Sequence, residues 1–337
     1  MKLKTKALLG AAMLALMAGS ASAGDLVCLI TKNNTNPFFV KMKEGAEAKA
    51  AEMGMDFQAY AGEKDGDAAP QITAIENCVA AGAKGILITA SNDSVGPALK
   101  EARAAGILVI ALDTPLADTE AQDMTFATDN FQAGLLIGQW AAATLGAEGA
   151  AAAKIAMLDI NKDNISVDVQ RDTGFLVGFG IEVPDLSVMG SETDARVIGH
   201  ESSDANPEGG LRAMETLLAK DPDINVVYTI NEPAAEGAFQ ALQAAGKTDV
   251  LVVSVDGGCP GIASVKSGVI GATSQQYPLL MASLGVEAIA AFAKDGTKPA
   301  ATDGLTFFNT GVNLVTDKPA EGVPSIDSTK GTELCWG

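Results

Sequence analysis

Short apolar runs alternate along the chain with longer segments whose apolar residues recur every three or four positions. The short runs are rich in Val and Ile and span residues 26–30, 85–89, 108–112, 155–158, 226–230 and 250–255. Because they are apolar at consecutive positions, they predict parallel strands that helices cover on both faces. The longer segments predict helices over residues 38–53, 69–81, 95–105, 131–145, 209–220, 234–245 and 279–293. This alternation predicts an α/β fold with doubly wound parallel sheets.

The first 23 residues follow a different pattern. Three lysines precede an apolar run over residues 7–18, which is too short to cross a bilayer. Residues 21–23 then match the small-residue cleavage pattern of a secretory signal peptide. We therefore predict a signal peptide over residues 1–23, cleavage after Ala23 and export of a soluble mature chain.

The remaining chain is large and acidic. About 310 residues are more than one hydrophobic core usually serves, which favours two domains. The full sequence has 23 basic and 42 acidic residues and a net charge of −19; without the three leader lysines, the remaining 20 basic residues leave −22. Because such a surface repels phosphate backbones, the charge argues against nucleic-acid binding.

Four cysteines are present, at Cys28, Cys78, Cys259 and Cys335. In an oxidising compartment they permit up to two disulfides, and three pairings are possible. Buried free thiols that act as small apolar side chains are the alternative. The cysteine spacing indicates no zinc site, and we expect neither a metal nor a cofactor.

The residues that follow the predicted strands are unusually polar. In doubly wound sheets, ligands bind beyond the carboxyl ends of the strands. Neutral amides, hydroxyls and isolated carboxylates at these positions suit a ligand with many hydroxyl groups. The candidates there are Asn36, Asp113, Thr114, Asn231, Asp256 and Gln276. The sequence contains no P-loop motif for phosphate.

Two adjacent aromatic residues, Phe38 and Phe39, open the first predicted helix directly after Pro37. Neighbouring residues on a helix point about 100° apart, so we expect at least one ring to be free to contact a ligand. Packing of both rings in the core is the alternative. The apolar C–H face of a sugar ring suits stacking on an aromatic side chain.

The sequence offers few groups for catalysis. His200 is the only histidine and ends a predicted strand over residues 196–200, where we expect a structural or surface role. Neither GxSxG nor HExxH occurs. Asp113 and Asp256 as a glycosidase pair remain an open alternative, because sequence spacing does not exclude it. We predict a binding protein and not an enzyme.

Several short motifs, taken in order and spacing, resemble the ribose-binding branch of the periplasmic sugar-binding proteins. The resemblance runs from residue 25 to about residue 315 and looks closest to fructose-type components of ABC importers. The motifs are Asn36-Pro37-Phe38-Phe39, Leu112-Asp113, Thr128-Asp129-Asn130, Arg171-Asp172-Thr173-Gly174-Phe175, Asn231-Glu232, Val255-Asp256-Gly257 and Gln276-Tyr277-Pro278.

The resemblance implies a role for each matching residue. Phe38 and Phe39 would stack on the sugar. Asp113 and Asp256 would accept hydrogen bonds from its hydroxyl groups, and Arg171 would donate to hydroxyl or ring oxygens. The polar rim would be completed by Asn36, Asn231 and Gln276.

The resemblance also implies two lobes joined by three crossovers. An N-terminal lobe would comprise residues 24–128 and 278–306, and a C-terminal lobe residues 129–277 and 307–337. Sugar-induced hinge closure of a periplasmic monomer would present a composite surface to an ABC permease in the inner membrane. The same closed form could instead, or in addition, signal to a chemoreceptor or sensor kinase. A sugar-responsive repressor shares this body, but here a predicted signal peptide occupies the place of its DNA-binding segment.

Two departures from ribose-specific relatives bear on the sugar. Thr114 follows Asp113 where those relatives have an arginine, and Ala205 falls near the position of a pocket aromatic. Both changes remove volume, so we expect a ketohexose such as fructose to be preferred over ribose. Ribose, or another pentose or hexose, is the alternative.

Overall fold

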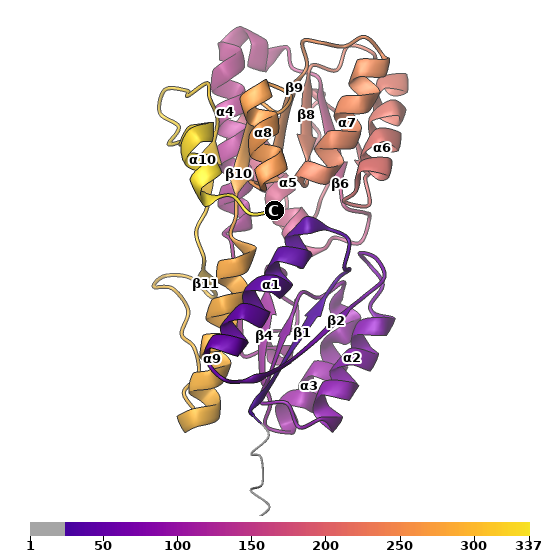
Figure 1. Ribbon diagram of the computed structural model, residues 1–337. Coiled ribbons are helices and arrows are strands. Elements are labelled where there is room, and N and C mark those ends of the chain that lie inside the picture. Colours follow the sequence, from indigo (N-terminus) through magenta and orange to yellow (C-terminus); the bar gives the residue numbers. More distant parts are fainter. Residues whose placement is uncertain (1–23) are drawn as a thin grey trace, which may run out of the picture.

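The structure is a computed structural model in which residues 24–337 are described; the predicted signal peptide lies outside the described residues. Two six-stranded sheets form the centres of two lobes (Figure 1). The first sheet has the order β11-β5-β4-β3-β1-β2, and all its strands pair in parallel. Its strands are β1 (Leu26–Thr31), β2 (Asp56–Ala61), β3 (Gly85–Ile88), β4 (Leu108–Leu112), β5 (Met124–Ala127) and β11 (Phe308–Asn309).

The second sheet repeats this arrangement. Its order is β12-β10-β9-β8-β6-β7, and only the edge strand β12 pairs antiparallel, with β10. Its strands are β6 (Ile155–Asp159), β7 (Val197–Ser202), β8 (Val226–Thr229), β9 (Leu251–Asp256), β10 (Ala272–Gln275) and β12 (Asn313–Val315). The predicted α/β class with two doubly wound lobes is therefore confirmed.

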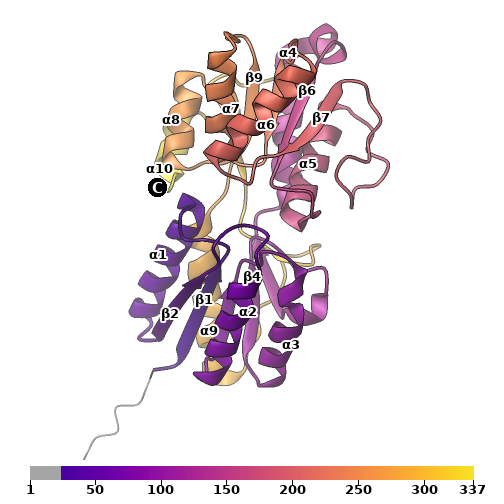
Figure 2. The same cartoon turned by 90° about the vertical axis from the view of Figure 1, so that its right-hand side faces the viewer.

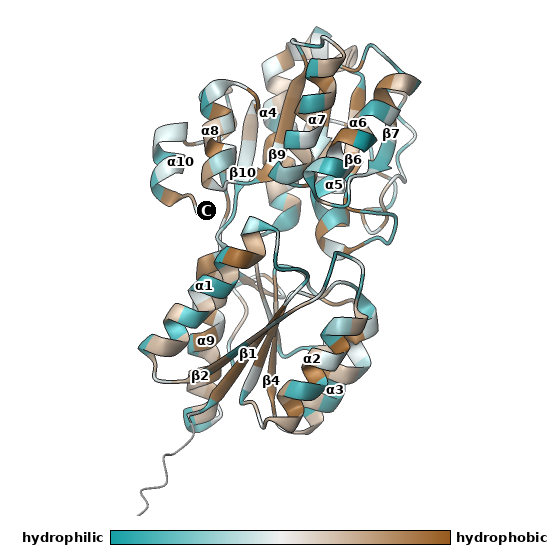
Figure 3. Ribbon diagram, turned by 45° about the vertical axis from the view of Figure 1, so that its right-hand side comes forward, coloured by the Kyte–Doolittle hydropathy of each residue, from teal (hydrophilic) through white to brown (hydrophobic). Residues whose placement is uncertain are grey.

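Helices cover both faces of each sheet (Figures 1 and 2). In the first lobe they are α1 (Pro37–Glu52) and α9 (Pro278–Asp295) on one face, and α2 (Ala69–Ala80) and α3 (Gly96–Ala104) on the other. In the second lobe they are α4 (Asn130–Ala151) and α5 (Ser166–Phe179) on one face, and α6 (Pro207–Lys220) and α7 (Glu232–Ala244) on the other, with α8 (Cys259–Ser267) and α10 (Ser328–Leu334) beyond them. Figure 3 shows β1, β4 and β9 as hydrophobic along their length, which is why these strands were readable from sequence.

The chain passes between the two sheets three times. It leaves the first sheet after β5, returns after β10 to form α9 and β11, and leaves again for β12. Phe308 and Asn309, which we assigned to the C-terminal lobe, pair with β5 of the first sheet. The last passage therefore follows Asn309, a few residues beyond the expected position near residue 307, because the short parallel edge strand β11 was not visible in the sequence pattern.

The four cysteines form two disulfides, so the alternative of free thiols is wrong. Cys28 on β1 is bonded to Cys78 on α2, inside the first lobe. Cys259, at the start of α8, is bonded to Cys335, directly after α10. The second bond fixes the C-terminal segment to the second lobe. In both ribbon views this segment lies beside the first turn of α1 (Figures 1 and 2).

Candidate functional site

A cavity between the lobes collects nearly all the predicted site residues. Its walls come from the first lobe (Lys32, Asn36, Phe38, Phe39, Asp65 and Asp113) and from the second (Ile160, Val167, Arg171, Ala205, Ile230, Asn231, Asp256 and Gln276). Thr114 is the one predicted site residue that does not line it. Its hydroxyl donates to Asp113 Oδ2 at 2.9 Å, so Thr114 supports Asp113 from behind.

Arg171 lies at the centre of the polar groups. Its Nη2 donates to Asp113 Oδ1 at 3.4 Å and to Gln276 Oε1 at 3.1 Å. Gln276 Nε2 in turn donates to Asp256 Oδ1 at 2.8 Å. Because Asp113 belongs to the first lobe and the other three belong to the second, this chain of bonds connects the lobes. It also presents donors and acceptors side by side, as hydroxyl groups require.

Close packing of two helices sets the position of Arg171. Helix α5 runs so near α4 that a Cβ added to Gly134 would lie 2.0 Å from the Arg171 carbonyl oxygen. A Cβ on Gly174 would likewise lie 2.2 Å from the carbonyl oxygen of Phe131. Glycine is therefore required on both helices at this crossing. From there the Arg171 guanidinium reaches Asn130 Oδ1 at 2.8 Å and the Ile230 carbonyl at 3.1 Å, which hold its orientation.

The two aspartates both end strands in unusual backbone conformations. Asp113, directly after β4, has φ 62°, and Asp256, the last residue of β9, has φ 149°. Positive φ in a residue other than glycine costs free energy and persists only where the surroundings enforce it, often at functional sites. Here both residues line the cavity between the lobes.

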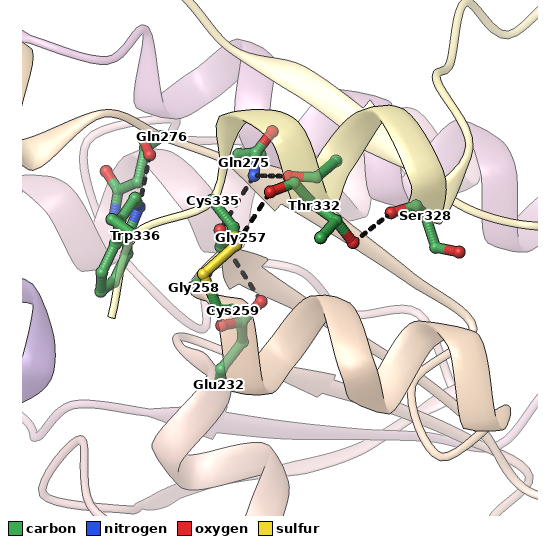
Figure 4. The surroundings of a disulfide bond; sticks show 11 residues. Glu232, Gly257, Gly258, Cys259, Gln275, Gln276, Ser328, Thr332, Cys335 and Trp336 are labelled. Carbon is green, nitrogen blue, oxygen red and sulfur yellow. Dashed lines mark hydrogen bonds between the residues drawn. A yellow bond between two sulfur atoms is a disulfide. The ribbon is translucent and has the colours of Figure 1, made fainter.

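Glu232 supports the loop that carries Asp256. Its carboxylate accepts hydrogen bonds from the backbone N–H groups of Gly257 at 2.8 Å and Gly258 at 3.0 Å (Figure 4). The Thr273 hydroxyl donates to it at 2.8 Å. Burial, reinforced by the charge of Asp256, raises the pKa of Glu232 to about 8. Burial also raises the pKa of Asp256 to about 6, against the opposing pull of Arg171.

The aromatic pair lies at the cavity wall. Phe38 and Phe39 are 4% and 6% exposed and their rings meet edge to face at 5.4 Å. Both belong to the apolar cluster of the first lobe and both border the cavity, because the cavity adjoins that cluster. Each ring therefore combines the core and ligand-facing positions that we had treated as alternatives.

The two predicted asparagines also cap helices. Asn36 Oδ1 accepts from Phe38 N at 2.9 Å at the start of α1, and Asn231 Oδ1 accepts from Ala234 N at 3.0 Å at the start of α7. The remaining amide of Asn231 donates to the Ala205 carbonyl at 3.1 Å. Capping fixes the side chains and so leaves each with fewer groups free for a ligand.

Sequence reasoning missed the ion pair of Lys32 and Asp65, which lines the same cavity. Lys32 Nζ lies 3.7 Å from Asp65 Oδ1, and both side chains are at least nine-tenths buried. Burial raises the pKa of Asp65, while Lys32 acts to lower it. The available signal was Lys32 itself, a charged residue immediately after the apolar first strand.

Sequence reasoning also missed Trp336. Its indole N–H donates to the Gln276 carbonyl at 2.7 Å (Figure 4), and its ring meets Phe38 edge to face at 5.6 Å. The Trp336 carbonyl accepts from Cys259 N at 2.8 Å, next to the disulfide. The residue is 7% exposed. The signal was the pair Cys335-Trp336, to which we could assign no function from sequence.

A second, larger cavity opens beside the first. It has a volume of about 440 Å³ and shares Asn36 and Asp256 with the smaller one. Most of its other lining residues, including Pro233, Phe239 and Trp336, offer apolar surface. The smaller cavity is the better candidate for a polyhydroxylated ligand, because there the polar side chains of both lobes converge.

The fold is that of a two-lobed α/β binding protein, and the candidate site is the cavity between its lobes. A family model described as periplasmic binding protein domain matches residues 27–298. The chain belongs to this family. Among residues 24–337, we find no helix with the length and apolar character needed to cross a membrane.

Curated relatives agree with this assignment, and a solved structure shares the fold. The chain is 34% identical over 285 residues to the ribose import binding protein of Haemophilus influenzae, which covers 84% of this chain and 91% of that protein. It is 28% identical over 280 residues to a D-apiose import binding protein of Paraburkholderia graminis, covering 83% and 84%. A solute-binding protein of Actinobacillus succinogenes with bound D-allose superposes with a TM-score of 0.74 at 22% identity, covering 92% of this chain and 99% of that one. This last likeness supports the fold.

Proposed function

We propose that the protein is the periplasmic sugar-binding component of an ABC importer and that it binds one monosaccharide without catalysing a reaction. The observation that carries the proposal is the convergence of Arg171, Asp113 and Asp256 from both lobes on one cavity beside an aromatic pair. The names of its relatives, which include ribose, D-apiose and D-allose import or binding proteins, support the same class.

Hinge motion is part of this proposal. The cavity between the lobes has a volume of only about 30 Å³. Pockets for small molecules usually enclose roughly 300 to 1,000 Å³. A monosaccharide therefore enters when the lobes part, and contacts from both lobes would then favour the closed form. The closed form would present residues of both lobes to the permease.

We further propose that a ketohexose such as fructose is preferred over ribose. Ala205 borders the cavity, and its small side chain leaves room that an aromatic ring would fill. Thr114 contributes less than we expected, because its side chain lies behind Asp113. The relatives carry the names of other sugars, so the preference depends on the chain's own residues.

Calorimetric titration of the mature protein tests both monosaccharide binding and the preference for a ketohexose. The protein is unfolded in guanidinium to remove any bound sugar, refolded with its disulfides intact, and titrated with D-fructose, D-ribose, D-allose and D-glucose. We expect one site with a Kd of about 1 μM or tighter, roughly −8 kcal/mol. No saturable heat with any sugar would contradict the class. Tighter binding of ribose than of any hexose would contradict the ketohexose preference alone.

A further inference from the structure

A second cluster of ionisable side chains lies in the second lobe, outside the cavity between the lobes. His200, on β7, is surrounded by carboxylates from three other segments. Its Nδ1 lies 2.8 Å from Asp159 Oδ2 on β6 and 3.4 Å from Asp172 Oδ2 on α5. Its Nε2 lies 2.8 Å from Glu192 Oε1 in the segment before β7. Asp159, Asp172 and His200 each have one side-chain ligand atom that lies within 4.8 Å of the ligand atoms of the other two.

We infer that Asp159, Asp172 and His200 form a binding site for a divalent transition-metal ion of the Zn²⁺ type. Zinc sites commonly use three protein ligands of the nitrogen and oxygen type at about 2.0 to 2.2 Å, with an open fourth position. In a tetrahedron of that size the ligand atoms lie about 3.3 to 3.6 Å apart. The separation of 3.4 Å between His200 Nδ1 and Asp172 Oδ2 matches this spacing. The 2.8 Å between His200 Nδ1 and Asp159 Oδ2 is a hydrogen-bond distance, so these two atoms would move apart to share an ion.

Glu192 supplies the outer partner that metal-bound histidines usually have. One oxygen of its carboxylate lies 2.8 Å from Nε2 of the imidazole, while Nδ1 faces Asp159 and Asp172. With a metal ion on Nδ1, Glu192 would accept the Nε2–H. Such a carboxylate fixes the tautomer and the ring orientation of a metal ligand. The geometry thus contains both the ligands and the group that orients one of them.

The unpartnered state of Asp172 is an independent indication of a missing ligand. Its side chain is 0% exposed, and neither of its carboxylate oxygens has a hydrogen-bond partner among residues 24–337. One oxygen each of Asp159 and Glu192 is likewise buried without a partner in that part of the chain. Buried carboxylate oxygens are normally hydrogen-bonded, so a group that binds them is expected.

A proton is the competing occupant of the site. Burial lowers the pKa of His200, but hydrogen bonds to Asp159 and Glu192 outweigh it and raise the pKa to about 11. Burial and the charge of Asp159 also raise the pKa of Asp172 well above its usual range. Protons can therefore satisfy the cluster without a metal, and the experiment must separate the two. A cavity of about 200 Å³, lined by Asp159 and His200 among others, gives an ion access and room for a fourth ligand.

From the sequence we expected no metal, because a single histidine and scattered carboxylates carry no ligand motif. Asp159, Asp172 and His200 lie on β6, α5 and β7, and only the sheet order β8-β6-β7 brings them together. Asp172 is also the neighbour of Arg171 on α5. An ion would therefore tie the helix that carries Arg171 to the edge of the second sheet.

Zinc titration of the mature protein tests the site. After treatment with EDTA and dialysis, the protein is titrated with Zn²⁺ by calorimetry, alone and in competition with a chromophoric chelator. We expect one high-affinity site that His200→Gln and Asp172→Asn each weaken by at least tenfold. Glu192→Gln should weaken it about 10- to 100-fold, as loss of an outer-shell partner does. Asp163→Asn, which changes an exposed carboxylate of the same lobe, should bind like wild type.

Sugar titration and thermal melting of each variant show whether it is folded, independently of the metal. Co²⁺ absorption of the wild type then decides the matter even where a variant fails to fold. Intense visible bands from a site of low coordination number, abolished by one equivalent of Zn²⁺, support the proposal. No saturable Zn²⁺ binding, equal affinity in wild type and His200→Gln, or only the weak bands of hydrated Co²⁺ would mean that protons alone occupy the cluster, and would overturn it.

Discussion

The ring of Trp336, which a disulfide-anchored segment holds on the second lobe, lies edge to face against Phe38 of the first lobe at 5.6 Å. The same indole donates to the carbonyl of Gln276, a residue that lines the cavity between the lobes. Trp336 thus contacts one residue of the candidate site in each lobe. This relationship makes it a positioning residue for Phe38 and Gln276.

We therefore expect Trp336→Ala to weaken sugar binding about 2- to 13-fold, the equivalent of an aromatic pair worth roughly 0.5 to 1.5 kcal/mol. Trp336→Phe keeps the aromatic contact but loses the indole donor, so it should retain most of the affinity. Calorimetry on the three proteins measures this. Unchanged affinity in Trp336→Ala would show that the contact is purely structural.

The two disulfides should differ in their effect on binding. Removing either one, by Cys335→Ser or by Cys78→Ser, should lower the free energy of unfolding by about 2 to 5 kcal/mol. Only Cys335→Ser releases the segment that holds Trp336, so only this variant should also lose sugar affinity. The Cys78→Ser protein is the matched control, and chemical denaturation with calorimetry provides both readouts. Equal affinities in the two variants would contradict the role given to the C-terminal segment.

Asp113→Ala and Asp256→Ala should each remove most sugar binding without unfolding the protein. A buried hydroxyl that loses its acceptor costs about 1 to 3 kcal/mol, and more when the acceptor was charged, which corresponds to a loss of roughly 5- to 150-fold or greater. Asp118→Ala, at an exposed carboxylate of the first lobe, should leave the affinity unchanged. Wild-type affinity in either cavity variant would remove that residue from the site.

Glu232 should make stability depend on pH. Its pKa rises from the usual 4.5 to about 8 in the folded protein, so the folded state holds a proton that the unfolded state releases. The stabilisation is full below pH 4.5 and is lost as the pH rises through 8. Glu232→Gln should flatten the unfolding free energy over this window, whereas Glu236→Gln, on the exposed face of the same helix, should not. Denaturant titrations from pH 4.5 to 8.5 measure the slope, and parallel curves for wild type and Glu232→Gln would refute the assignment.

The sequence pattern was most informative where side chains are uniformly apolar. The run over residues 108–112 matches β4 because a strand buried on both faces leaves no polar position. No bounds were predicted for helix α5, because Asp168, Arg171 and Asp172 are buried within it and interrupt the apolar pattern of its inward face. Strand β2 was missed because it is a half-exposed edge strand.

Some residues of the candidate site could likewise be predicted from sequence, and others could not. Residues at strand ends, such as Asp113 and Asp256, could be chosen from sequence because the fold class dictates that ligands bind there. Asp65, which lines the cavity from a loop, could not be chosen in this way. Nor could Trp336, which comes from a distant segment and contacts Phe38 and Gln276 of the cavity wall. The position of Trp336 depends on a disulfide, and that of Asp65 depends on an ion pair. The spacing of residues along the chain predicts neither pairing.

Because the chain crosses between the lobes three times, the last helix and strand of the first lobe come late in the sequence. Helix α9 buries Met281, Val286 and Ile289 against the first lobe, and β11 closes the edge of its sheet, yet both follow the entire second sheet up to β10 in the chain. A chain that emerges amino terminus first through a membrane therefore exposes the apolar face of β1 and α1 until residue 309 has followed. The first lobe therefore stays incomplete until nearly the whole chain has emerged, and the second lobe waits longer still, for β12 at the edge of its sheet and for Cys335.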